Sequence, residues 1–238
     1  SYVVVIRWCD SEWAGVIRNL HSFPTRRASD LNEQWKQKEY KLPKFDIGKV
    51  TENTIKNPAW IHFGAGNIFR AFIARLQQHL LNQGMVDTGI IVCEAFDEEI
   101  IEKAYRNYDN LSLAVTLKGS GDIDKEVLAS VVESVMPKSE PDRMSEIFTA
   151  DSLQIASFTI TEKGYAIKDA DGKLFPLISK DFEAFDDPSS TIGILTKLLF
   201  LRYTSGEKPL ALVSMDNCSH NGTLLKNAVL AFANAWVQ

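Results

Sequence analysis

The sequence is poor in cysteine and has no excess of positive charge. Its three cysteines, Cys9, Cys93 and Cys218, lie far apart, and no Cys-x-x-Cys pair occurs. This excludes a disulfide-rich fold and a cysteine-rich zinc site, and it is typical of a reducing compartment. Lys and Arg number 26 against 31 Asp and Glu, which gives a net charge of −5. We expect no nucleic-acid partner, because non-specific binding to nucleic acid requires a basic surface.

Long apolar runs and export signals are also missing. The apolar stretch 194–201 is interrupted by Thr196 and Lys197, and no run approaches the roughly 20 residues that cross a bilayer. No segment has the basic, apolar and small-residue order of a secretory signal. Hydrophobic residues make up 45% of the chain and charged residues 24%, as in globular proteins. We therefore expect a cytoplasmic protein without a membrane partner.

The N-terminal region differs from the rest of the chain. Ser22–Leu31, with the sequence Ser-Phe-Pro-Thr-Arg-Arg-Ala-Ser-Asp-Leu, resembles a peptide produced when sequencing-adapter DNA is translated. Tyr2–Ile6 could form a short strand, but no sustained periodicity follows it. We expect residues 1–31 to be a non-native or disordered leader. The alternative is a native flexible arm, in which residues 26–29 could serve as a kinase site.

The last residues form a helical pattern that has no stop signal. Apolar residues recur on one helix face at Leu225, Val229, Phe232 and Trp236, and no Gly, Asn or Pro ends the pattern. We expect the chain to lack a C-terminal portion, and we expect Phe232 or Trp236 to be exposed as a result.

Strands and helices alternate through the rest of the chain. Short apolar runs predict buried strands at 59–63, 89–93, 111–117, 127–135, 153–161 and 210–215. Helical spacing and helix-start residues predict helices at 68–82, 98–105, 141–149, 192–203 and after Gly222. Such alternation implies right-handed crossovers. The predicted fold class is α/β, with a doubly wound, mostly parallel Rossmann-type sheet in one domain over residues 32–238.

The strongest local motif is a glycine turn between a strand and a helix. The strand ending at Phe63 runs through Gly-Ala-Gly directly into the next helix. Backbone N–H groups at such a helix start can approach a pyrophosphate, and the helix dipole favours its charge. The third small position of the usual fingerprint is Phe69 here, which weakens the motif. The predicted cofactor-binding residues of this turn are Gly64, Ala65, Gly66, Asn67, Ile68 and Phe69.

An acidic residue follows the next predicted strand. Glu94 can accept hydrogen bonds from both hydroxyls of an adenosine ribose, and its charge repels a 2′-phosphate. This favours NAD over NADP as the cofactor. Asp97 competes for the same role, and an acid at this position also serves S-adenosylmethionine in Rossmann methyltransferases.

Two later strands end in polar clusters, Ser157–Tyr165 and Ser214–Gly222. Ligands of open α/β sheets bind beyond the carboxyl ends of the strands, so we expect both clusters to line one crevice with the glycine turn. An Asn there can donate to a developing alkoxide, and a buried Glu can carry protons. Asn217 and Asn221 could instead cap a helix or form turns. His62 and His79 have no partners at metal-ligand spacing, so we expect no metal site.

Three segments together resemble the mannitol dehydrogenase family of polyol-specific long-chain dehydrogenases. They are Phe63–Arg70, Thr161–Tyr165 (Thr-Glu-Lys-Gly-Tyr) and Asp216–Gly222 (Asp-Asn-Cys-Ser-His-Asn-Gly). The resemblance covers about residues 31–238 and implies a Rossmann domain followed by a helical substrate domain. It implies hydride transfer between NAD(P) and a polyol, ketose or sugar acid, without a metal. Gly-Ala-Gly-Asn-Ile is also similar to mannitol-1-phosphate 5-dehydrogenase, which leaves the substrate open.

The resemblance also assigns roles to two residues. Asn217 is similar to the family's Asn that binds the reacting oxygen, and Glu162 to its Glu on a proton path, so both are predicted catalytic residues. The family's catalytic Lys belongs to the helical domain and has no counterpart in these 238 residues. We therefore expect an NAD-binding fragment of a sugar or sugar-acid dehydrogenase that is inactive alone. The alternative is a complete nucleotide-binding module without catalysis.

Overall fold

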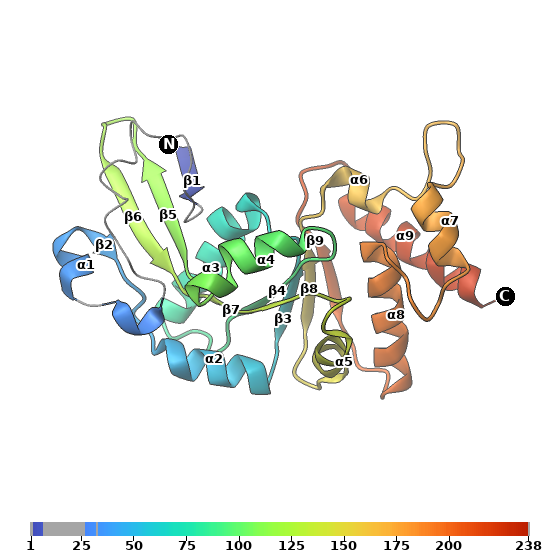
Figure 1. The fold of residues 1–238 in the computed structure, drawn as a ribbon, viewed down its shortest axis with the longest axis horizontal. Coiled ribbons are helices and arrows are strands. Elements are labelled where there is room, and N and C mark those ends of the chain that lie inside the picture. Colours follow the sequence, from blue (N-terminus) through green and yellow to red (C-terminus); the bar gives the residue numbers. More distant parts are fainter. Residues whose placement is uncertain (1, 7–26, 32, 238) are drawn as a thin grey trace. The chain divides into compact units, whose positions relative to one another are not determined.

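The computed structural model describes residues 2–6, 27–31 and 33–237. These residues fold into two compact units, which are described separately. Most of the predicted leader, residues 1–31, lies outside the described part of the chain. Of that leader, Tyr2–Ile6 forms the predicted strand, β1 (Figure 1).

The first unit comprises Ser1–Ile55, Gly66–Ile90 and Glu98–Ser134. Its four-stranded sheet has the order β1-β5-β6-β2. Besides β1, the strands are β2 (Tyr40–Lys41), β5 (Ser112–Leu117) and β6 (Ile123–Leu128). β5 pairs antiparallel with both β1 and β6, whereas β2 pairs parallel with β6. Apolar residues from β2, β5 and β6 form a small core with Trp35.

Helices of the first unit include an unusual turn directly after the glycine motif. A π-helical segment, Phe69–Ile73 (η2), continues into α3 (Ala74–Asn82), and Phe69 is completely buried. Single π turns inside α-helices occur frequently at functional sites. The other helices of this unit are η1 (Ala28–Asp30), α1 (Glu33–Gln37), α2 (Ile47–Lys56), α4 (Glu98–Ala104) and η3 (Arg106–Tyr108).

A five-stranded sheet has the order β7-β4-β3-β8-β9. Its strands are β3 (Trp60–Phe63), β4 (Ile90–Cys93), β7 (Val131–Val135), β8 (Ile155–Phe158) and β9 (Ala211–Ser214). The pairs β3–β4, β3–β8 and β8–β9 are parallel. By position in the chain this order is 3-2-1-4-5, that of doubly wound dinucleotide-binding folds. The predicted Rossmann-type, mostly parallel sheet is thereby confirmed.

The second unit comprises Lys56–Ala65, Ile91–Asp97 and Val135–Gln238. Its helices are α5 (Pro141–Thr149), α6 (Thr161–Tyr165), α7 (Pro176–Phe182), α8 (Thr191–Thr204) and α9 (Asn221–Trp236). The expected exposure of the α9 apolar face is wrong. Phe232 is completely buried and packs against Phe182, and the Trp236 indole N–H donates to the Asp181 carbonyl at 3.1 Å. α7 supplies the partners that the sequence pattern did not reveal.

Two predicted strands are shorter than expected, each for an identifiable reason. The predicted strand 127–135 is divided between β6 and β7. Gln78 bonds the Val127 carbonyl and the Ala129 N–H through its side-chain amide, which takes these groups out of a continuous ladder. The predicted strand 153–161 ends at Phe158, since Thr161 adopts a left-handed φ of 64° and begins α6.

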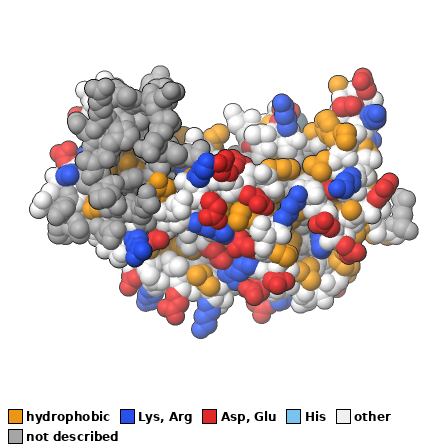
Figure 2. Space-filling view, in the orientation of Figure 1, with side chains coloured by type: hydrophobic (Ala, Val, Ile, Leu, Met, Phe, Trp, Pro, Cys, Tyr) orange, Lys and Arg blue, Asp and Glu red, His pale blue; other side chains and the backbone are white. Residues whose placement is uncertain are grey.

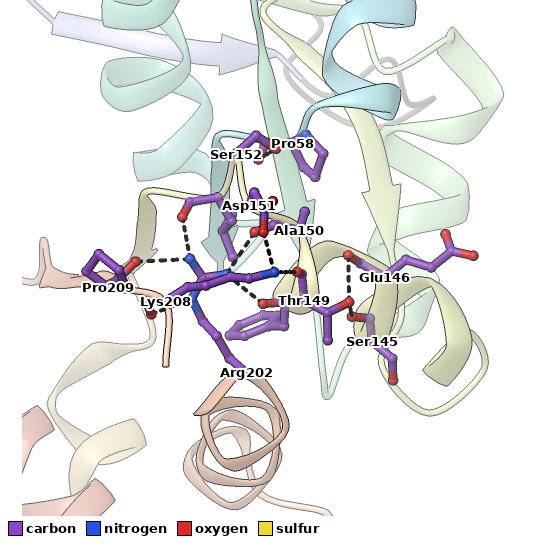
Figure 3. A network of polar contacts seen from close by, with 12 residues as sticks. Pro58, Ser145, Glu146, Thr149, Ala150, Asp151, Ser152, Arg202, Lys208 and Pro209 are labelled. Carbon is purple, nitrogen blue, oxygen red and sulfur yellow. Dashed lines mark hydrogen bonds and ion pairs between the residues drawn. The ribbon is translucent and has the colours of Figure 1, made fainter. Parts of the chain in front are cut away.

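A buried arginine joins three segments of the second unit. Arg202, near the end of α8, donates to five backbone carbonyls at 2.7–3.0 Å: Phe148, Ala150, Leu153, Lys208 and Pro209 (Figure 3). These carbonyls precede β8 and β9. Arg202 therefore fixes the amino ends of both strands.

Charges of both signs mix on the face of the molecule drawn in Figure 2. Lys and Arg side chains alternate there with Asp and Glu over the part of the surface that is described. The helices in the described part of the chain do not include a candidate membrane span. No group of three or more His, Cys, Asp or Glu within the described ranges could hold a metal ion.

Candidate functional site

The carboxyl ends of four parallel strands carry the predicted site residues. Gly64 follows β3, Glu94 follows β4, Glu162 follows β8 and Asn217 follows β9. β4 and β8 lie on opposite sides of β3, so the strand order reverses between β3 and β8. Ligands of open α/β sheets bind at this switch point. The fold therefore brings these four residues to the sheet edge where binding is expected.

The two glycines of the turn have different reasons to be glycine. Gly64 has a φ of +107°, and a Cβ there would lie 2.3 Å from the Thr159 carbonyl oxygen. The fold itself therefore excludes any side chain at position 64. A Cβ at Gly66, in contrast, would meet no atom within 4 Å. Nothing in the described protein requires a glycine at position 66.

The amides of the turn divide into bonded and free groups. The Gly64 N–H donates to the Cys93 carbonyl at 2.9 Å, and the Ala65 N–H to Glu94 Oε2 at 3.0 Å. The N–H groups of Gly66, Asn67 and Ile68 have no acceptor among the described residues, and all three residues are exposed. The first N–H groups of a helix have no partner within it and can bind anions.

Side chains at the start of this helix contact each other within the first unit. The Arg70 guanidinium donates to Asn67 Oδ1 and lies over the Tyr105 ring, 5.5 Å from its centroid. Arg70 is buried, as is Phe69, whereas Ile68 is exposed. The Phe69 side chain is therefore not accessible to a ligand, and the Asn67 side-chain oxygen already accepts from Arg70.

Glu94 links the glycine turn to the loop after β4. Its Oε2 accepts the Ala65 N–H, and its Oε1 accepts the N–H groups of Ala95 and Phe96 at 3.1 Å. A carboxylate has about four lone-pair sites, and Oε2 accepts only the Ala65 N–H from the described residues, so one of its two sites is open. Glu94 can thus orient the turn and still accept a hydrogen bond from a ligand.

A carboxylate between β8 and β9 organises the two polar clusters. Asp216 accepts the N–H groups of Ile160 and Thr161, each at 3.0 Å, and the Tyr165 hydroxyl at 2.6 Å. Burial and the bond to Asp216 raise the pKa of Tyr165, so its hydroxyl remains a donor at neutral pH. Asp216 and Tyr165 belong to the quoted motifs, but sequence reasoning gave them no role.

The predicted catalytic residues lie beside this carboxylate. Glu162 and Asn217 are both exposed, and neither has a hydrogen-bond partner within the described ranges. Burial, Asp216 and Glu162 raise the pKa of the Cys218 thiol, which indicates that the Glu162 carboxylate is near the Asn217–Cys218 turn. Glu162 is not the buried acid that sequence reasoning described. Both side chains are free to meet a ligand.

Asn221 takes the structural role that the sequence left open for it. Its side-chain amide donates to the carbonyls of Ser214 and Asp216, at 3.3 and 2.9 Å. His220 precedes α9 with a left-handed φ of 55° and is exposed. These contacts fix the turn that carries Asn217.

A row of polar side chains crosses from β3 to β8. The Trp60 indole N–H donates to Ser157 Oγ at 2.7 Å, and His62 Nδ1 lies 2.7 Å from the same oxygen. His62 Nε2 lies 2.8 Å from Thr159 Oγ1. Sequence reasoning excluded His62 as a metal ligand and gave it no other role. The alternation of polar residues in two buried strands was a signal for this row.

His62 should make stability depend on pH. Burial lowers the pKa of His62 from 6.5 to about 3, so the unfolded chain binds a proton below pH 6.5 that the folded chain does not. The free energy of unfolding therefore falls with pH below 6.5, by about 2 kcal/mol at pH 5 from this residue alone.

Urea unfolding of the wild type and His62→Gln at pH 7 and pH 5 measures this effect. The loss on acidification should be about 2 kcal/mol smaller in the variant. His79→Gln, at an exposed histidine outside this row, is the control for the substitution itself, and the smaller loss should be specific to His62→Gln. Equal losses for the wild type and His62→Gln would show that His62 is protonated in the folded chain.

Comparison with known proteins places these features in a family. The profile of the mannitol dehydrogenase Rossmann domain matches residues 58–238. D-mannonate oxidoreductase of Thermotoga maritima is 46% identical over 208 residues, which cover 86% of this chain and 39% of that protein. D-mannonate oxidoreductase of Escherichia coli is 33% identical, with 76% of this chain and 40% of that protein covered.

A solved structure agrees with this assignment. Pseudomonas fluorescens mannitol 2-dehydrogenase, in a ternary complex with NAD and D-mannitol, has a TM-score of 0.72 and 25% identity. The match covers 86% of this chain and 42% of that protein. The chain thus spans about two fifths of the length of the curated relatives it matches. The chain belongs to the mannitol dehydrogenase family and corresponds to its Rossmann domain.

Proposed function

We propose that the chain is the NAD-binding domain of an oxidoreductase that acts on the CH–OH or ketone group of a polyol, ketose or hexuronate. The observation that carries this proposal is the set of free, exposed N–H groups at Gly66, Asn67 and Ile68, on the turn that follows β3. The relatives named as D-mannonate oxidoreductases and the mannitol 2-dehydrogenase bound to NAD support it.

The residues of the turn fit a dinucleotide. The pyrophosphate accepts hydrogen bonds from the free N–H groups of residues 66–68. The open space at Gly66 supports this placement, because only a ligand would make a side chain there unfavourable. Gly64 and Ala65 hold the turn in shape, and the free lone pair of Glu94 accepts an adenosine ribose hydroxyl. NAD supplies the hydride acceptor, and NADH the hydride donor.

Asn217 and Glu162 act on the substrate side. The Asn217 amide donates to the reacting oxygen as it gains negative charge, and the exposed Glu162 carboxylate exchanges protons between this site and water. Asp216 positions both, since it bonds the start of α6 and directly precedes Asn217. We assign the general base, a Lys in the family's helical domain, to a segment outside these 238 residues. The chain alone then binds NADH without turnover.

Glu94→Ser tests the cofactor assignment. The wild type should bind NADH and discriminate against NADPH, because the Glu94 carboxylate repels a 2′-phosphate. In the variant we expect NADPH affinity to rise and NADH affinity to fall, which reduces the preference by roughly tenfold, or about 1.4 kcal/mol. Nicotinamide fluorescence during titration measures both affinities.

Asp97→Ser is the matched control, because Asp97 lies in the same loop and its backbone N–H, which the substitution keeps, donates to Glu94 Oε1. It should leave the preference unchanged. Failure of the wild type to bind NADH would refute the proposed function, whereas a change of preference in Asp97→Ser alone would transfer the ribose contact to Asp97.

A further inference from the structure

Four polar side chains form one hydrogen-bonded row across the switch point of the sheet. Trp60 and His62 alternate on β3, and Ser157 and Thr159 alternate on and just after β8, so each pair projects to one face. His62 is directly opposite Ser157 in the parallel register. The contacts Trp60–Ser157, Ser157–His62 and His62–Thr159 measure 2.7, 2.7 and 2.8 Å.

The number of protons and acceptors in this row determines which group donates in each hydrogen bond. The Trp60 indole can only donate, so Ser157 Oγ accepts from it. If the Ser157 hydroxyl donates to His62 Nδ1, then His62 Nε2–H donates to Thr159 Oγ1, and every buried proton has an acceptor. The opposite arrangement would leave the proton of Ser157, a fully buried residue, without an acceptor among the described residues. Such a group costs about 1–3 kcal/mol, so the first arrangement is favoured.

The neutral form of His62 is required for this arrangement, because Nδ1 must accept. Burial keeps the imidazole neutral, with its pKa lowered to about 3. The tautomer with the proton on Nε2 is then fixed by Ser157 on one side and Thr159 on the other. Thr159 Oγ1 accepts from His62, and its own hydroxyl proton is left to donate elsewhere.

The row ends where a ligand is expected. Thr159 is the first residue after β8, is partly exposed, and lies against the glycine turn. A Cβ on Gly64 would lie 3.1 Å from Thr159 Oγ1. Glu94 follows β4, on the other side of β3. A dinucleotide whose adenosine ribose is at Glu94 and whose pyrophosphate crosses the turn therefore extends its other half toward Thr159.

We infer that the Thr159 hydroxyl is a hydrogen-bond donor to an oxygen of the dinucleotide beyond its AMP moiety, and that His62 and Ser157 are positioning residues that hold this hydroxyl in its donating orientation. The inference rests on the proposed function. A hydroxyl whose rotation is already restricted loses less conformational entropy when it binds. The row thus prepares one donor at the switch point before the cofactor arrives.

Thr159→Val tests the donor. It keeps the shape of the side chain and removes the hydroxyl, and we expect NADH to bind about tenfold more weakly, the usual effect of one lost hydrogen bond. Thr159→Ser restores the donor and should bind NADH within about twofold of the wild type. AMP binding should be the same in all three proteins, since AMP lacks the acceptor. Calorimetric titration measures these affinities.

Shortened ligands identify the acceptor. A weaker affinity of Thr159→Val already for ADP indicates a phosphate oxygen, a loss that begins with ADP-ribose indicates a ribose hydroxyl, and a loss confined to NADH indicates the carboxamide. Each of these outcomes supports the inference. Unchanged NADH affinity in Thr159→Val, or an equal loss for AMP, overturns it. If the wild type itself does not bind NADH, the proposed function fails instead.

Ser157→Ala tests the positioning role. It leaves Thr159 in place but removes the acceptor for Trp60 and the donor to His62, so we expect NADH to bind about threefold more weakly. In the double variant with Thr159→Val the second change should add nothing, because both act through one hydroxyl. Additive losses would overturn the positioning role, since a merely structural effect of Ser157 would persist without the Thr159 hydroxyl.

Discussion

Replacing Gly66 by Ala is expected to weaken NADH binding about a hundredfold while leaving the free chain as stable as the wild type. In the free chain a Cβ at this position meets nothing within 4 Å, so no protein contact opposes it. On the proposed placement of NADH, the new methyl group would occupy the space through which the pyrophosphate would approach the N–H groups of Asn67 and Ile68. Loss of one or two hydrogen bonds to a charged group costs about 3 kcal/mol, which is about a hundredfold in affinity.

Gly64→Ala is the matched comparison, because the same methyl group is added two residues earlier. Its Cβ would lie 2.3 Å from the Thr159 carbonyl oxygen at a φ of +107°, so we expect a lower urea midpoint even without ligand. Urea unfolding and NADH titration of both variants separate the two roles. If Gly66→Ala bound NADH like the wild type, the pyrophosphate would not lie on these amides, and the proposed placement of the cofactor would be wrong.

The sequence motif predicted the position of this turn, but it could not predict which of its backbone N–H groups bond within the protein and which are open to a ligand. Ala65 is bonded by Glu94, a residue 29 positions away, and such a contact follows from the pairing of β3 with β4 rather than from any local pattern. For the same reason the role of Asp216 was missed, since its partners Ile160, Thr161 and Tyr165 lie more than 50 positions away. Local patterns predicted which strand ends would meet, whereas the contacts between them required the fold.

Strand positions were predictable where short apolar runs mark them, both in the buried β3 and β4 and in β9, which is only partly buried. β3, β4 and β9 are short apolar runs in the sequence, and each forms within one or two residues of its predicted bounds. The prediction of one continuous strand over 127–135 was wrong, because the side-chain amide of Gln78, from α3, takes the place of part of the backbone hydrogen bonding between strands. α7 has no clear apolar period of its own, and it is stable because Ile178 and Phe182 pack in the core with α9.

Of the substitutions considered, Arg202→Met should lower the free energy of unfolding most, although Arg202 has no role in the proposed binding site. Arg202 is 2% exposed, and its five N–H donors each meet one backbone carbonyl. Methionine fills the same volume but leaves those carbonyls without donors. Because each unsatisfied buried group costs about 1–3 kcal/mol and three of the five bonds are only partly buried, we expect a loss of about 3–5 kcal/mol, a large part of the stability of a typical domain.

Two controls make this expectation specific. Lys208→Met removes a neighbouring cation that donates to the Thr149 carbonyl at 2.8 Å and contacts the exposed Asp151 (Figure 3), and it should cost less than about 1 kcal/mol. Arg202→Lys keeps the charge but has only three donors, so its urea midpoint should lie between those of Arg202→Met and the wild type. A loss in Arg202→Met no greater than in Lys208→Met would contradict the role of the guanidinium.

The position of Arg202 also predicts that its substitution should leave the NADH affinity unchanged. The carbonyls it binds precede β8 and β9, whereas Thr159 and Asn217 follow these strands. Where Arg202→Lys is fully folded, its NADH affinity should therefore equal that of the wild type. Titration of this variant with NADH, at a temperature where far-ultraviolet circular dichroism shows full folding, measures it. A weakened affinity under those conditions would mean that the amino ends of the strands set the geometry of the carboxyl ends, and that stability and binding in this sheet are coupled.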